Sequence, residues 1–272
     1  MIKRLHPMRK GLTMIEMIFV IVVLGIVASI GSEIIANVYK GYVLQRAQYR
    51  ASIRTELALN QIANRLRYAI PKTVMVEEGG ALIPITEVAS HTSNRLQWVA
   101  YDGDSFEAIG SSTDRRPGWS GMIDLDGNIT STSLSTPGSN LDLAKEIIEN
   151  LGGSESNCRI YFPDLNGSNY PVTGLSGSTL SVTMSQKDMV YERYKLAWSS
   201  YALVKEGDGL YLYYNFSPVP KAALGNEKSL LLNNVNIFRF RGAEGILRIK
   251  LCSSERITED SNVTVCKERV IF

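Results

Sequence analysis

Glu16 is the only acidic residue in a stretch that runs from Leu12 to Ser32 and is otherwise almost entirely apolar. A carboxylate inside an apolar helix costs on the order of a few kcal/mol unless a cation pairs with it. Two interpretations are open: the side chain reaches the lipid headgroups, or a positive group of another molecule meets it. The chemistry that this residue could perform is charge pairing in apolar surroundings.

The residues before this stretch are basic. The first eleven contain Lys3, Arg4, Arg9 and Lys10 and no acid, and such a cluster stays on the cytoplasmic side of a membrane. The following stretch matches a hydrocarbon core of about 30 Å at a rise of about 1.5 Å per residue. A signal peptide cut near Ala28 is the alternative, but its apolar region normally has about 7 to 15 residues and no acid. We therefore predict one membrane-spanning helix, residues 12–32, with the rest of the chain exported.

The start of the apolar stretch has a distinctive pattern. A basic leader ending in glycine precedes a hydrophobic residue, a threonine, two apolar residues and an acid: Lys10-Gly11-Leu12-Thr13-Met14-Ile15-Glu16. This pattern resembles the prepilin processing site of type IV pilins and type II secretion pseudopilins. The resemblance implies that prepilin peptidase removes residues 1–11 by cutting after Gly11 and that the new amine of Leu12 is N-methylated. It also implies that Glu16 pairs with the Leu12 amine of a neighbouring subunit.

The same resemblance implies where the protein acts and with what. The chain is expected in the inner membrane as a single-pass protein with a periplasmic head, and then in a pilus or pseudopilus filament. Its expected partners are other pilins or pseudopilins in the filament or a tip complex, prepilin peptidase and inner-membrane lipid. No cofactor is expected.

Three features are similar to the PilW-type minor pilins and the J-type minor pseudopilins of type II secretion. They are the chain length, a helix ending at Ile70-Pro71, and the region from Leu232 to Cys252. Major pilins often carry a proline about twenty residues into the mature helix, where this chain has Gly31-Ser32-Glu33. We therefore expect a minor subunit.

Three cysteines occur in the chain. Cys252 and Cys266 lie in consecutive predicted strands, and an exported domain meets an oxidising compartment. We expect these two to form a disulfide, which closes a loop of about 15 residues and is worth about 3 kcal/mol in the chain-entropy model. Cys158 is expected to be a small buried side chain.

Two neighbouring predicted strands carry basic residues at alternate positions. Arg239 and Arg241 alternate with phenylalanines, and Arg248 and Lys250 alternate with apolar residues, so one face could present all four. This basic patch could contact a partner subunit or DNA, and a DNA-binding competence-type pilin is the alternative function. A solvated sheet face is the simpler interpretation, because no aromatic residue interleaves the patch on that face.

Other chemistry has weaker support. Asp124, Asp126 and Asn128 are spaced like cation ligands, but Ile129 and Ser135 stand where a calcium loop needs glycine and glutamate, so we expect a plain turn and no metal site. The chain has only two histidines and no phosphate loop, nucleophile elbow or HExxH motif. We expect a structural protein and not an enzyme.

The elements that position these residues follow from periodicity. An apolar face recurs from Tyr42 to Ile70 and predicts that residues 33–70 continue the helix in amphipathic form, ending before Pro71. A globular head, residues 71–272, is expected to be an antiparallel sheet with one short helix, Leu141 to Leu151, and a variable surface excursion over residues 102–140. The fold class is therefore α+β, with a long N-terminal helix packed on the sheet.

Composition agrees with this organisation. The chain has 272 residues, of which 44% are hydrophobic and 21% charged, and a net charge of +2. These values exclude a disordered chain and a protein that coats nucleic acid over its whole surface, and the confinement of the apolar stretch to the N-terminal part excludes a polytopic membrane protein.

Overall fold

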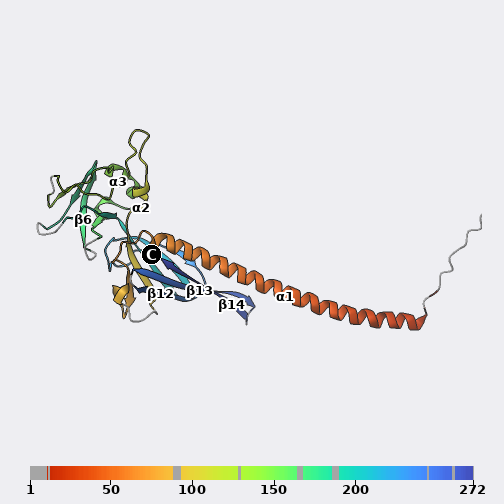
Figure 1. Ribbon diagram of the computed structural model, residues 1–272. Helices are drawn as coiled ribbons and strands as arrows, with labels where there is room; N and C mark the ends of the chain where they lie inside the picture. The colour runs from red at the N-terminus through yellow and green to blue at the C-terminus, as the bar shows by residue number, and fades with distance from the viewer. Residues whose placement is uncertain are drawn as a thin grey trace, which may run out of the picture.

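A computed structural model shows a long helix that projects from a head built of strands (Figure 1). It describes residues 11, 13–87, 93–127, 130–163, 168–185, 190–243, 245–258 and 261–271. Every strand pair in these ranges is antiparallel. The predicted α+β fold, with a long N-terminal helix followed by antiparallel sheets, is confirmed.

Helix α1 runs without interruption over Met14–Leu66, 53 residues, which is about 80 Å at a rise of about 1.5 Å per residue. It ends four residues earlier than the predicted Ile70. The reason is competition from the sheet, because the amide of Ile70 donates to the carbonyl of Val99 at 2.8 Å and Ala69 bridges to Ala100. The last residues of the expected helix are therefore drawn into strand pairing.

The predicted apolar face from Tyr42 to Ile70 is buried in its second part, at Leu59, Ile62, Leu66 and Ile70, and exposed in its first part. Tyr42, Tyr49, Ile53 and Leu57 remain 40% to 68% exposed. The buried positions begin with small residues and end with large ones: Ala47, Ala51, Thr55, Ala58, Leu59, Ile62 and Leu66. Small side chains allow close approach of a neighbouring element, so packing geometry and not side-chain size selects the buried face here.

Two sheets and the end of α1 form the helix-packed lobe. The six-stranded sheet has the order β11-β10-β9-β3-β1-β2, and the three-stranded sheet has the order β12-β13-β14. Their bounds are β1 Met75–Glu78, β2 Ala81–Pro84, β3 Arg95–Ala100, β9 Ser199–Glu206, β10 Gly209–Phe216, β11 Lys228–Leu232, β12 Val235–Ala243, β13 Ile246–Thr258 and β14 Ser261–Ile271. A short 3₁₀ turn, Ile85–Glu87, follows β2.

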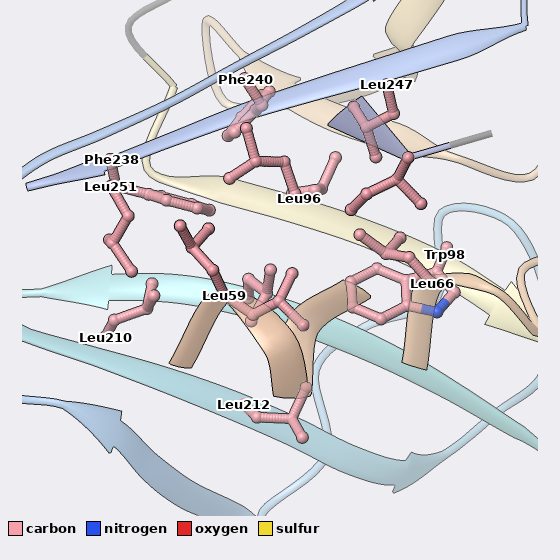
Figure 2. Close-up of a cluster of buried hydrophobic side chains, with 14 of the residues drawn as sticks. Leu59, Leu66, Leu96, Trp98, Leu210, Leu212, Phe238, Phe240, Leu247 and Leu251 are labelled. Carbon is pink, nitrogen blue, oxygen red and sulfur yellow. The ribbon is translucent and has the colours of Figure 1, made fainter. Parts of the chain in front are cut away.

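The core of this lobe lies between α1 and the two sheets. Figure 2 shows Leu59 and Leu66 of the helix among side chains from both sheets, including Trp98, Leu210 and Phe240. Leu66, Leu96 and Trp98 are completely buried. The end of α1 is thus held by apolar contacts with both sheets.

The chain between β3 and β9, which pair with each other, forms an inserted lobe. It has a five-stranded sheet of order β4-β7-β6-β5-β8. Its elements are α2 Gly103–Glu107, β4 Ser133–Ser135, α3 Leu141–Asn150, the 3₁₀ turn Glu155–Asn157, β5 Arg159–Tyr161, β6 Asn169–Ser176, β7 Thr179–Val182 and β8 Lys195–Ala197. The predicted short helix corresponds to α3, and Gly152 beyond it has φ +87°, which a glycine adopts without strain.

Residues 102–140 belong to this second lobe. They contain little regular structure, as expected for an excursion, but Trp119, Ile123 and Leu134 are at most 2% exposed and pack into its core. The expectation of a surface excursion is therefore corrected. The polar composition of this segment concealed apolar side chains spaced too irregularly to reveal a periodic element.

Candidate functional site

The start of α1 is a capping box. Thr13 is the N-cap, its hydroxyl accepts from the amide of Glu16 at 3.3 Å, and its own amide donates to the carboxylate of Glu16 at 3.5 Å. Gly11 is exposed, while residues 1–10 and Leu12 lie outside the described residues. In the sequence, Thr13 and Glu16 are interpreted as part of the processing site, although the same Thr-x-x-Glu spacing is also the signature of a capping box. An acid in the first turn is also favoured by the helix dipole.

The first part of α1 is largely exposed in the part of the chain that the structure describes. Ile15, Phe19, Leu24 and Ile35 are 67% to 76% exposed, and within the described part of the chain Glu16 forms no ion pair. The helix is long and apolar enough to cross a membrane. We call residues 14–46 the stem, and its surface requires lipid or neighbouring helices as cover.

Beyond the stem, α1 packs against the β13–β14 hairpin, and we call the polar contacts between them the clasp. The hydroxyl of Thr55 donates to the carbonyl of Ala51 at 2.7 Å and accepts from the hydroxyl of Ser253 at 2.7 Å, both in a buried position. Arg54 and Glu255 form an ion pair at 3.3 Å outside it. A buried polar pair of this kind fixes the register of helix against hairpin.

Cys252 and Cys266 face each other across β13 and β14 and are joined by a disulfide. Cys252 is fully buried and is followed directly by Ser253 of the clasp. Cys158 has a free thiol, and its burial in the inserted lobe raises its pKa to about 12. A thiol with such a pKa is protonated at neutral pH and is a poor nucleophile.

The basic patch is brought together on one face of the three-stranded sheet. Arg239 lies directly opposite Lys250, and Arg241 lies directly opposite Arg248; all four side chains are exposed. Like charges directly opposite each other destabilise a sheet. Within the described residues, one acid offsets them, Glu268, which contacts Arg248 at 3.2 Å.

Asp102 lies at the junction of the two lobes. It is 3% exposed, its side chain accepts from the amide of Ser105 at 3.2 Å, and its carbonyl accepts from the indole of Trp119 at 2.8 Å. Burial raises the pKa of the Asp102 carboxyl to about 6, although the bonds with Ser105 lower it in part. Sequence reasoning missed this residue because nothing in its neighbours predicts its burial.

The candidate cation loop is a turn where it is described. The side chain of Asp124 accepts from the amide of Asp126 at 3.1 Å, and the amide of Asp124 donates to the carbonyl of Ser135 at 2.9 Å. Asn128 and Ile129 lie outside the described residues. Among the residues that the structure describes, no three acidic, histidine or cysteine side chains gather as metal ligands.

Comparison with known proteins gives one match, and it falls on the helix start. Residues 7–32 match the family model of the prokaryotic N-terminal methylation motif. This supports a type IV pilin-like or pseudopilin-like protein. That family is structural and assembles with other pilins after processing by prepilin peptidase. No curated protein and no solved structure matches the chain.

Proposed function

We propose that the protein is a minor pilin or pseudopilin, a structural subunit that joins or primes a type IV pilus or a type II secretion pseudopilus. The observation that carries the proposal is the methylation motif at the head of α1. It is continuous with an exposed apolar stem and then with a helix end buried in the head. A filament subunit needs this order of processing site, assembly helix and folded head.

In this role the residues at the helix start have separate tasks. Prepilin peptidase cuts after Gly11, and the methylated amine of Leu12 becomes the new N-terminus. Glu16 caps its own helix in the isolated subunit and pairs with the Leu12 amine of a neighbour in the filament. A charge pair in apolar surroundings adds little net stability but penalises wrong registers strongly, since a mismatch leaves a charge unpaired. The inner membrane holds the stem until assembly, with the head in the periplasm.

Processing tests the proposal. On coexpression with prepilin peptidase, intact-mass measurement should show a chain that starts at Leu12 and carries one methyl group. Gly11→Leu should leave the leader attached, because a bulky residue does not fit before the scissile bond. Gly25→Leu is the matched control, since a Cβ atom placed there has no neighbouring heavy atom within 4 Å. A mature terminus near Ser29 would instead indicate a signal peptide and refute the proposal.

DNA binding is a second candidate function, favoured by the register of the basic patch. Two like-charged pairs stand opposite each other at a cost in stability, which a polyanion would relieve. Binding of duplex DNA to the full chain should weaken with salt, and Arg239→Ala with Arg248→Ala should reduce the salt slope by about 1 per lost phosphate contact. Arg46→Ala, which removes an exposed charge from the stem, is the control. An unchanged slope rejects this function and leaves the first.

A further inference from the structure

A row of tyrosine and arginine side chains follows the membrane-length part of α1. Its members lie three, four or seven residues apart and therefore share one side of the helix: Tyr39, Tyr42, Arg46, Tyr49 and Arg50. The three tyrosines are 59% to 68% exposed, and both arginines are exposed. We call these five residues the tyrosine–arginine stripe. Tyr42 and Tyr49 belong to the predicted apolar face but remain uncovered on the folded chain.

The charge of this part of α1 is entirely positive. Residues 34–55 contain no acid and four basic residues: Lys40, Arg46, Arg50 and Arg54. Arg54 is paired with Glu255, whereas the other three cations form no ion pair with the residues that the structure describes. Three uncompensated cations on one segment next to an apolar helix favour a negatively charged surface as their partner.

The stripe faces away from the surface of α1 that the head covers. Ala47 and Ala51 each lie two residues from Tyr49, which is about 160° around a helix of 3.6 residues per turn, and they are 7% and 1% exposed. The β13–β14 hairpin packs on that covered side, where Thr55 contacts Ser253. The stripe can therefore meet a flat surface without displacing the head.

The apolar surface of α1 is longer than a membrane is thick. An upright helix crosses a hydrocarbon core of about 30 Å in about 20 residues, and from Met14 this length ends near Glu33. Ile34 and Val38, beyond that point, are still 58% and 67% exposed. A helix accommodates such an excess by tilting, by up to about 40°. At that tilt the hydrocarbon core takes about 26 residues and ends near Lys40.

We infer that α1 tilts toward the tyrosine–arginine stripe and lays it on anionic lipid headgroups, on the side of the membrane that holds the head. On the underside of the tilted helix, Tyr49 and Arg50 stand about 7 Å above the hydrocarbon, which is the depth of the headgroup layer. Tyrosine is enriched at this level, and each basic residue near an anionic surface favours binding about fivefold. A tilt in the opposite direction would press the hairpin into lipid, so the covered side of α1 selects the direction.

A second copy of the helix suits the stripe less well than lipid does. Two copies packed through it would bring Arg46 and Arg50 of both chains together on a segment that has no acid, and unpaired charges between packed helices are costly. An anionic surface meets Lys40 and both arginines at once. The inference rests on membrane insertion of the stem, which is part of the proposed function, and adds to it a lipid class and an orientation.

Lipid capture by the full chain tests the inference, in vesicles of three parts phosphatidylethanolamine to one part phosphatidylglycerol. A benzophenone amino acid replaces Tyr49, and the lipid that it captures on illumination is identified by mass spectrometry. We expect a ratio of captured phosphatidylglycerol to phosphatidylethanolamine at least about tenfold above that of the vesicle, given about fivefold for each of two nearby cations. Gln48 is exposed and lies about 160° from Arg50, so the same group at Gln48 should capture little lipid.

Removal of charge tests the preference for anionic lipid. Arg46→Gln with Arg50→Gln should lower the captured ratio at least about fivefold, since two cations are lost. Arg239→Gln with Arg241→Gln is the matched control, because it removes two exposed arginines from the head and should leave the ratio unchanged. Salt at about 1 M, which shortens the screening length to about 3 Å, should act like the stripe variant.

Each failure has a distinct meaning. The inference is overturned if Gln48 captures as much lipid as Tyr49, if the stripe variant keeps the wild-type ratio, or if the control variant lowers the ratio equally. Capture of a second chain at Tyr49 in place of lipid would overturn it in favour of helix packing. A chain that sodium carbonate extracts from the vesicles overturns both the inference and the membrane role, whereas an inserted chain that captures no lipid at Tyr49 overturns the inference alone.

Discussion

The two halves of α1 belong to one continuous helix but have opposite surroundings. Ile15 and Leu24 in the stem are 76% and 67% exposed, whereas Leu59 and Ile62 near the helix end are each 1% exposed. The stem carries large apolar side chains that are mostly exposed, whereas the rest of α1 buries small residues first and then Leu59, Ile62 and Leu66. Hydrophobicity alone therefore does not show which part of this helix belongs to the core. The large apolar side chains of the stem need lipid or another subunit to cover them.

The largest effect is expected at Glu16, where a change alters assembly and not the head. Glu16→Ala should insert in the membrane and be cut after Gly11, yet its recovery with partner pilins should fall at least tenfold. Glu16→Gln sharpens the test, because glutamine also completes a capping box but carries no charge. If the charge acts, both variants fail in co-purification. Wild-type recovery of the Gln variant would leave only the capping role.

The disulfide beside the buried end of α1 should contribute to the stability of the head. Reduction, or Cys252→Ser with Cys266→Ser, should lower the free energy of unfolding of the head by about 3 kcal/mol. All three tryptophans lie beyond residue 71, so their fluorescence during urea unfolding of the full chain in micelles reports on the head. Non-reducing peptide mapping should show this pair with Cys158 free. A link between Cys158 and Cys252 would contradict the strand pairing.

The buried Asp102, at the junction of the two lobes, should make the stability of the head depend on pH. Its folded pKa of about 6 lies above the ordinary value of 3.8, so the folded state binds more protons and stability falls as pH rises between these values. The loss amounts to at most about 3 kcal/mol. Asp102→Asn keeps an acceptor for the amide of Ser105 and should be nearly neutral at pH 4 but stabilising at pH 8. Parallel stability curves for variant and wild type would contradict the burial argument.

The smallest expected effect is a difference in head stability between substitutions at two apolar positions of α1. Ala51→Leu inserts bulk beneath the hairpin, where the residue is 1% exposed, and should cost about 1–3 kcal/mol through overpacking. Leu57→Ala removes a side chain that is 56% exposed and should change head stability by less than about 0.5 kcal/mol. Urea unfolding of both variants gives the comparison. Equal costs would show that the two sides of the helix are not distinct.

Sequence patterns predicted the elements better than their partners. Alternation in β12 and β13 predicted that Arg239, Arg241, Arg248 and Lys250 share a face, and the strand register places them there. Cys252 and Cys266 likewise lie opposite each other as the strand order suggested. Strand periodicity is local and has only two faces, so it can be read directly from the chain.

The faces of α1 and the inserted lobe were harder to predict for the same physical reason. Which side of a helix is buried depends on the element that covers it, and here the hairpin selects Ala47, Ala51 and Thr55 over the larger Tyr49 and Ile53. Burial of Asp102 and Trp119 depends on contacts between segments far apart in sequence. Such contacts leave no periodic signal.

The clasp between helix and hairpin has a mechanical consequence. The hairpin runs alongside α1 (Figure 1), and their polar links follow one another along the helix, from Arg54 with Glu255 to Asn60 with Arg269. Tension applied along the stem therefore loads these contacts in shear, so that they must yield together and not one after another as in peeling. The disulfide beside them prevents the two strands from separating at Cys252. Pulling on the stem thus transmits force to the whole head before it can strip the helix away.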